Sequence, residues 1–177
     1  MAVDEEVVQP EQTSEIPLSS KPLDPSFLLV PCRKLMHTQL GTVSADTTVF
    51  AAAKLMAENG YGCVLVVTGT TLDGIFTERD LMNKIVATGM DPAACTVGDY
   101  MTHDPETLRP DDEVAYALRA MMLGGFRHVP VVDTDRRLVG IFSARDLKRL
   151  VLEHFEREIS TLPPTPHYQE ADSRHGA

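Results

Sequence analysis

Apolar residues in this chain alternate between helical spacing and short continuous runs. After Asp46, and again after Asp111, apolar side chains recur at intervals of three and four residues, which predicts two one-sided helices with these aspartates as N-caps. Two short apolar runs separated by a turn follow each helix, and each pair predicts a β-hairpin. The runs are 63–67 and 72–76 in the first half and 129–132 and 138–142 in the second.

A hydroxyl residue follows each hairpin, with an aspartate three residues later. Thr77 precedes Asp80, and Ser143 precedes Asp146. A hydroxyl that accepts from the backbone of a carboxylate residue three positions on is typical of a capping box at the start of a helix. Each half therefore ends in a second predicted helix.

The two halves are copies of one unit. Gly74–Leu81 returns as Gly140–Leu147, and the alignment also places Met36 on Met101, with one extra residue in the second hairpin turn. With a short first strand at 42–43 or 107–108, the unit reads β-α-β-β-α. A unit of about 60 residues has too little interior to be more than marginally stable alone, so we expect two units in one α+β domain.

The duplicated features resemble a known family. The order of the elements, the hydroxyl-x-x-Asp after Gly-Ile-Phe and the segment Arg127–Val132 are similar to a tandem pair of cystathionine-β-synthase (CBS) domains, a Bateman module, over roughly residues 28 to 158. The resemblance implies a regulatory, non-catalytic module whose repeats pack sheet to sheet about a pseudo-twofold axis. It also implies two clefts that bind adenosine-containing ligands, and in most such modules a dimer.

The resemblance divides the chain into four parts. Residues 28–93 form the first CBS repeat and residues 94–159 the second. Residues 1–27, which are acidic, and residues 160–177 contain several prolines without apolar periodicity, so we expect disordered tails. A module flanked only by tails would regulate a separate target protein.

Composition narrows the function classes. A net charge of −10 argues against a nucleic-acid partner, because phosphate backbones are held by clustered Lys and Arg. No apolar stretch is long enough to span a membrane, and the acidic first residues do not look like a signal peptide. We therefore expect a cytoplasmic protein. Its three cysteines have no metal-binding spacing and suggest reduced thiols.

The paired motif suits a nucleotide. A carboxylate accepts hydrogen bonds from both ribose hydroxyls, which is the role we assign to Asp80 and Asp146. Thr77 and Ser143 cap helices whose N-termini favour a phosphate. An isolated motif of this kind is usually only a capping box, but its duplication here favours ligand binding.

The two repeats differ where charge matters. Arg127 and His128 stand where the first repeat has Gly62 and Cys63, so we expect a single cleft equipped for phosphate, unless the two basic residues are merely solvated. The resemblance implies crossed clefts. The first, ranked as the nucleotide site, contains Thr77, Asp80, Thr107, Arg127, His128, Val129 and Pro130; the second contains Thr42, Gly62, Cys63, Leu65, Ser143 and Asp146. Arg79 and Arg145 either reach a phosphate or pair with a neighbouring carboxylate such as Glu78.

The leading prediction is a regulatory module that binds AMP, ADP or ATP, with magnesium if the ligand is ATP. We find no catalytic machinery, no metal site and no need for another cofactor. Alternatives are a sensor of S-adenosylmethionine or a dinucleotide with the same fold, and a ligand-free dimerisation scaffold. Because the sulfonium of S-adenosylmethionine would be repelled by basic groups, Arg127 and His128 favour the nucleotide.

The last helix predicts the assembly. Its apolar stripe continues beyond the length of the corresponding helix in the first repeat, towards Ser160. In the resembling family such helices meet in a disc-like dimer. We therefore expect a homodimer with Leu150, Val151 and Phe155 at or near the contact; the alternative is that Phe155 folds back on its own domain.

Overall fold

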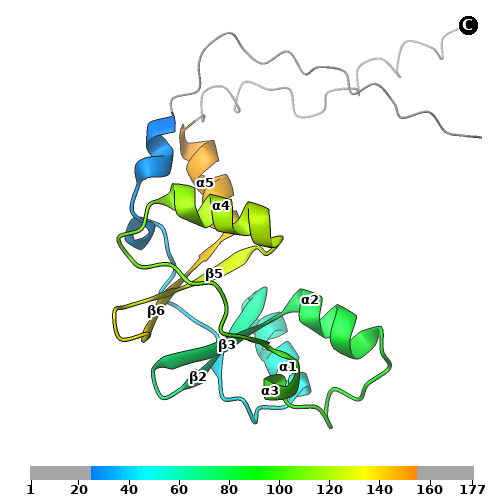
Figure 1. The fold of residues 1–177 in the computed structure, drawn as a ribbon. Helices are drawn as coiled ribbons and strands as arrows, with labels where there is room; N and C mark the ends of the chain where they lie inside the picture. Colours follow the sequence, from blue (N-terminus) through cyan, green and yellow to red (C-terminus); the bar gives the residue numbers. More distant parts are fainter. Residues whose placement is uncertain (1–24, 155–177) are drawn as a thin grey trace, which may run out of the picture.

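The computed structural model describes residues 25–154, which form two halves joined along a common interface (Figure 1). Two 3-10 helices come first, η1 (Pro25–Leu29) and η2 (Cys32–Lys34). The first repeat then contains β1 (Thr42–Val43), α1 (Val49–Asn59), β2 (Cys63–Thr68), β3 (Thr71–Thr77), α2 (Glu78–Asp80) and the π-helix η3 (Leu81–Val86). The second contains α3 (Val97–Tyr100), β4 (Thr102–His103), α4 (Val114–Gly124), β5 (His128–Val132), β6 (Leu138–Ser143) and α5 (Ala144–His154).

The strands confirm the predicted α+β class and the tandem repeat. β1 pairs in parallel with β2, β2 forms the predicted hairpin with β3, and β3 pairs with β4. In the second repeat β5 and β6 form the hairpin, and Leu108 makes a single parallel bridge to Val131 in place of a first strand. The two halves therefore share one pairing scheme.

Two helix starts differ from the prediction. Helix α1 is capped by Thr48, whose hydroxyl accepts from the Ala51 N–H, and α4 begins after Glu113. Asp46 instead accepts a hydrogen bond from Ser44, and Asp111 pairs with Arg33. Both aspartates lie in the turn before the helix, too early to reach its first free N–H groups.

The ends of the chain lie mostly outside the described residues. The predicted C-terminal tail, residues 160–177, lies outside them, as do residues 1–24 of the predicted N-terminal tail. Residues 25–27 belong to η1 instead of to the predicted tail. The predicted continuation of α5 to Ser160 also lies outside the described residues, because the description ends at His154.

The hydrophobic core of each repeat is completed by the leading segment of the other repeat. The first core is built on α1, β2 and β3, and it takes in Cys95, Val97 and Met101 from the start of the second repeat. The second core is built on α4, β5 and β6, and it takes in Cys32 and Met36 from the start of the first. Figure 1 shows η1 beside α4 and α5. The two repeats thus exchange their leading segments and cannot separate without opening both cores.

Backbone pairing fixes this exchange. Thr102 pairs with Ile75 on β3, and the corresponding residue His37 pairs with Ile141 on β6. The chain approaches so closely that Gly74 has no room for a side chain: an added Cβ would lie 2.5 Å from the Met101 sulfur and 2.8 Å from the Thr102 carbonyl oxygen. Glycine is therefore required sterically at this contact.

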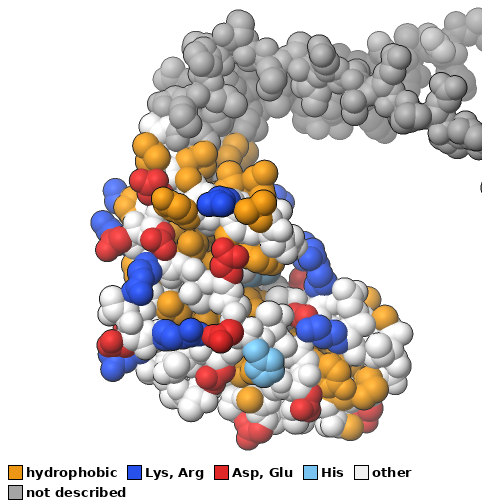
Figure 2. Space-filling view, in the orientation of Figure 1, with side chains coloured by type: hydrophobic (Ala, Val, Ile, Leu, Met, Phe, Trp, Pro, Cys, Tyr) orange, Lys and Arg blue, Asp and Glu red, His pale blue; other side chains and the backbone are white. Residues whose placement is uncertain are grey.

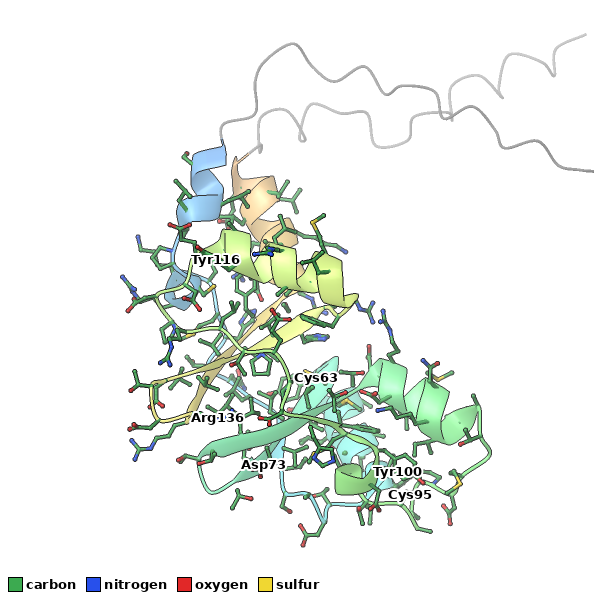
Figure 3. The ribbon with its side chains drawn as sticks, viewed as in Figure 1. Cys63, Asp73, Cys95, Tyr100, Tyr116 and Arg136 are labelled. Carbon is green, nitrogen blue, oxygen red and sulfur yellow. The ribbon has the colours of Figure 1, made fainter. Side chains whose placement is uncertain are left out.

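The two sheets pack against each other through a third apolar cluster. It contains Cys63, Leu65, Leu72, Ile75 and Val132, with Leu40, Leu138 and Ile141 packed around it. At the hairpin tips the Leu138 N–H donates to the Thr70 carbonyl at 2.9 Å. Arg136, at the tip of the second hairpin (Figure 3), pairs with Asp104, which follows β4. This interface fixes the position of the strand ends that carry the candidate site.

Gly74→Ala tests the exchange. We expect the added methyl group to lower the free energy of unfolding by about 1–3 kcal/mol, the usual cost of overpacking, in urea titrations followed by circular dichroism. Thr71→Ala, at an exposed position of the same strand, is the control and should change stability by less than about 1 kcal/mol. Equal stability of wild type and Gly74→Ala would contradict the close approach.

Candidate functional site

Two cavities lie beside the interface between the repeats. The larger has a volume of about 570 Å³ and the smaller about 300 Å³, both within the usual range for small-molecule sites. They are related by the internal repeat: Ile75, Thr77 and Arg79 line the smaller cavity, and their counterparts Ile141, Ser143 and Arg145 line the larger. The fold therefore builds the same site twice.

In the smaller cavity the wall is formed where β3 meets α2. Thr77 is the N-cap, and its hydroxyl and the Asp80 carboxylate form a reciprocal capping box, as predicted. Asp80 Oδ2 accepts from the Thr77 N–H at 2.9 Å and from its hydroxyl at 2.7 Å. Its other oxygen, Oδ1, lies 2.8 Å from Lys84 Nζ. The carboxylate is thus held rigidly, with 14% of its side chain exposed.

Arg127 and His128 lie between the two cavities and line both. The Arg127 carbonyl accepts from the Ala144 N–H at 2.9 Å, and the equivalent Gly62 carbonyl accepts from the Glu78 N–H at 3.1 Å. A Cβ on Gly62 would lie 2.8 Å from His128 Cε1. Glycine at this position lets the imidazole lie against the backbone of the first repeat, and the basic pair lines both clefts.

The His128 imidazole is held in its neutral form. Burial lowers its pKa below the ordinary value of 6.5, and the positive charges of Arg127 and Arg145 lower it further, against the opposing effect of Glu78 and Asp146. At neutral pH the ring therefore offers one N–H donor and one acceptor nitrogen. Of the predicted basic pair, Arg127 carries the charge.

Beside the larger cavity, the second aspartate, Asp146, is covered and does not reach the cavity. Asp146 is buried, with 1% of its side chain exposed. Its Oδ2 accepts from the Ser143 N–H at 2.8 Å and hydroxyl at 2.7 Å, and its Oδ1 lies 2.7 Å from His37 Nε2 and 3.3 Å from Arg149 Nη2. His37 lines this cavity, whereas Asp146 is not among its described lining residues.

Most of the predicted site residues gather at these two cavities, although their role in binding stays a prediction. The smaller contains Gly62, Thr77, Arg79, Asp80, Arg127 and His128; the larger contains Gly62, Cys63, Leu65, Arg127, His128, Ser143 and Arg145.

Other predicted residues lie elsewhere among the described residues. Val129 and Pro130 are buried in β5, and the Pro130 carbonyl already accepts from the Leu108 N–H at 3.0 Å. Thr42 and Thr107 line neither described cavity. Val129 follows the cavity-lining His128 directly along β5, so its side chain points to the opposite face, into the core of the second repeat.

Arg79 forms no ion pair with a carboxylate among residues 25–154, and its contact with a phosphate stays a prediction. Its Nη1 donates to the Gly125 carbonyl at 2.6 Å, so it joins the start of α2 to the C-terminal end of α4 across the smaller cavity. A guanidinium has five N–H groups, and this contact leaves further donors at the cavity wall. Arg79 therefore closes one side of the cavity and adds positive charge to it.

Several lining residues were not predicted. The smaller cavity has apolar walls at Pro105 and Phe126 and a carboxylate at Glu106, and Tyr61 lines the larger where Phe126 lines the smaller. The alignment of the repeats pairs Phe126 with Tyr61, so it contained the signal for an aromatic wall. Glu106 carries no comparable mark in the sequence.

The Cys63 thiol is not activated for nucleophilic chemistry. Burial raises the pKa of the Cys63 thiol to about 12, helped by the nearby Glu78 carboxylate, which makes it a poor nucleophile. Cys63 lies between the halves in Figure 3.

Within residues 25–154 no cluster of three or more His, Cys, Asp or Glu could hold a metal ion. None of the helices in that range combines the length and apolar character needed to cross a membrane.

The sequence pattern of the CBS domain matches this chain twice, at residues 32–87 and 97–153. The chain belongs to the CBS domain family. The two matches cover well over half of its 177 residues and begin within the leading segments that the repeats exchange. The predicted tandem CBS pair is thereby confirmed.

Two relatives show what the chain is similar to in sequence. It is 36% identical over 121 residues to an uncharacterized 17.7 kDa protein of Acidianus ambivalens, covering 68% of this chain and 72% of that one. It is 33% identical over 124 residues to the mitochondrial CBS domain-containing protein CBSX3 of Arabidopsis thaliana. That match covers 67% of this chain and 60% of CBSX3.

Two solved structures with bound ligands share the fold. The CBS domain pair of protein MJ0100, in complex with 5-methylthioadenosine and S-adenosyl-L-methionine, aligns with a TM-score of 0.66 at 25% identity, over 71% of this chain and 98% of that one. CBSX2 in complex with AMP aligns with a TM-score of 0.61 at 26% identity, over 70% and 97%. Both relatives bind ligands that contain adenosine.

The state of His128 leads to a prediction. In histidine ring NMR titrations we expect the pKa of His128 to lie below 6.5 and to move up towards 6.5 in Arg127→Gln, because a repelling charge is removed. Between the two pKa values the unfolded chain binds more protons than the folded one, so the free energy of unfolding falls as pH drops through this window. That loss should be smaller in Arg127→Gln.

The control for this titration is Arg119→Gln, which removes an exposed arginine from α4 and should leave the pKa of His128 unchanged. A wild-type His128 that titrates at or above 6.5 would contradict its burial against Gly62.

Proposed function

We propose that this chain is a regulatory, non-catalytic module that binds an adenine nucleotide in the smaller cavity. The observation that carries the proposal is the combination on one cavity wall of a capped, partly exposed Asp80 carboxylate with the Arg127 guanidinium. The first suits a hydroxyl of a ribose, and the second suits a phosphate.

The hydrogen bonds of Asp80 support the ribose contact. A carboxylate has about four lone-pair sites, and in Asp80 two are taken by Thr77 and one by Lys84. The remaining site is on Oδ1 at the cavity wall. Lys84 also donates to the Tyr100 carbonyl at 2.7 Å, so it orients the carboxylate from the side of the helix.

The other walls suit the phosphate and the base. Arg127 and Arg79 supply positive charge, and one charge-assisted hydrogen bond to a phosphate contributes about 1.5–3 kcal/mol. Ile75, Pro105 and Phe126 supply apolar surface for the face of an adenine. The AMP complex of CBSX2, which has the same fold, supports this reading.

S-adenosylmethionine is the second candidate ligand. Glu106 places a carboxylate in the smaller cavity, where it would attract a sulfonium or an amino group, and the neutral His128 would not repel them. MJ0100 binds S-adenosyl-L-methionine on the same fold. Arg127 and Arg79 favour the nucleotide over this alternative, since both carry full positive charge.

The wider role remains a set of predictions. We expect no catalytic activity and no required cofactor, with magnesium accompanying ATP if ATP is the ligand. The cytoplasmic location is also a prediction, and the similar CBSX3 is described as mitochondrial. Regulation would act on a separate target protein.

Thermal-shift and calorimetric titrations with AMP, ADP, ATP, NAD and S-adenosylmethionine test the proposal. We expect an adenine nucleotide to raise the melting temperature, because a ligand at a hundred times its Kd stabilises a protein by about 2.7 kcal/mol. Asp80→Ala and Arg127→Ala should each remove most of the shift, measured against the unliganded form of the same variant.

Matched controls are Asp135→Ala and Arg119→Ala, which remove the same charges at exposed positions that line neither described cavity. Both should retain the full shift. If S-adenosylmethionine alone stabilises the protein, the second candidate replaces the first. If none of the ligands does so, the module is a scaffold and the proposal is wrong.

We also propose a homodimer, with a revised contact surface. Of the residues predicted at or near the contact, Leu150 packs into the core of the second repeat, Val151 is exposed, and Phe155 lies outside the described residues. The outer surface of α4 and α5 instead exposes apolar side chains, and Figure 2 shows them gathered at that end of the molecule. They are Tyr116, Met122, Leu123, Val151 and Leu152.

Light scattering at micromolar concentration tests the dimer. We expect twice the chain mass of 19.5 kDa, and a monomer for Leu123→Glu, because Leu123 is 77% exposed and its replacement disturbs no core. Phe50→Glu is the control: it changes an exposed side chain of α1, and this variant should remain dimeric. A wild-type mass near 19.5 kDa with and without nucleotide would contradict the dimer.

A further inference from the structure

The two cavities are equivalent in the repeat, but their aspartates are not equally accessible. Asp80 lines the smaller cavity, with 14% of its side chain exposed, whereas the matching Asp146 is 1% exposed. Both follow a hydroxyl residue at the same spacing and make the same pair of hydrogen bonds to it. The difference must therefore come from the residues that approach the other carboxylate oxygen.

At Asp146 that oxygen is fully occupied. His37 Nε2 lies 2.7 Å from Oδ1, and Arg149 Nη2 lies 3.3 Å from the same atom. Together with the two contacts from Ser143, these fill the roughly four lone-pair sites of the carboxylate. Asp80 has one partner, Lys84, at its Oδ1. A ribose arriving in the larger cavity would meet the His37 ring where the smaller cavity presents a carboxylate.

His37 is held in this place by its backbone. Its N–H donates to the Ile141 carbonyl at 2.9 Å, and the Ile141 N–H donates back to the His37 carbonyl at 3.0 Å. In the smaller cavity the same bridge position opposite Ile75 is filled by Thr102, whose side chain is too short to cover Asp80 in the same way. In matched register the two clefts therefore differ by His37 and Thr102, and His37 makes the shorter of the two contacts that cover Asp146 Oδ1.

We propose that His37 determines which cleft accepts adenosine: its imidazole covers Asp146 and reserves nucleoside binding for the smaller cavity. The inference rests on the proposed function, since it concerns the ribose-binding carboxylate of the same class of site. It assigns the asymmetry between the clefts to His37 and Thr102, and not to the replacement of Arg127 and His128 by Gly62 and Cys63, because the basic pair lines both cavities.

An exchange of the two residues tests the inference, with AMP as the probe in isothermal titration calorimetry. Wild type should bind one AMP per chain tightly. His37→Thr should add a second site, and Thr102→His should weaken the tight site about tenfold or more by covering Asp80. The double variant should again bind one AMP, now sensitive to Asp146→Ala and not to Asp80→Ala.

His103→Thr, an exposed histidine of β4 that lines neither described cavity, is the control and should leave the stoichiometry unchanged. The melting temperature of each unliganded variant shows whether it folds. If His37→Thr does not fold, Thr102→His still tests the inference, because it leaves every contact of Asp146 in place. One site in both wild type and His37→Thr, or two equal sites in wild type, overturns the inference alone. If none of the four proteins binds AMP, ADP or ATP, the proposed function is overturned as well.

Discussion

The exchange of leading segments between the repeats is the constraint on which the rest of the structure depends. A repeat of this size is marginally stable alone, and each core here is completed by residues from the start of the other repeat. The bridges of Thr102 to Ile75 and of His37 to Ile141 close this exchange. Because the bridges run along the strands that end in Thr77 and Ser143, the interaction that joins the repeats also forms the walls of both cavities.

Pseudo-symmetry explains both the likeness of the two clefts and their difference. The paired hydroxyl and aspartate recur because the unit recurs, and Arg127 and His128 serve both clefts because they lie between them. Duplication does not preserve the residues that only touch the motif, however. His37 and Thr102 occupy one register position with different side chains. His37, together with Arg149, covers the Asp146 carboxylate, whereas Asp80 stays at a cavity wall.

The sequence predicts those features that depend on local spacing. Periodicity located α1, α4 and both hairpins, and the duplicated motif placed Thr77 and Asp80 correctly at a helix start. It missed features that depend on contacts between distant segments, such as the exchange, the contact of Arg79 with Gly125 and the cover of His37 over Asp146. The apolar stripe of α5 was similarly ambiguous, since periodicity does not distinguish a core face from a dimer contact.

The central proposal is that adenosine binds against Asp80 while the matching Asp146 remains covered. A crystal structure of the protein grown with AMP tests this most directly. The account predicts a ribose within hydrogen-bonding distance of Asp80 in the smaller cavity, with the 2.7 Å contact between His37 and Asp146 intact. A ribose bound to Asp146 in the larger cavity, with His37 displaced, would contradict it.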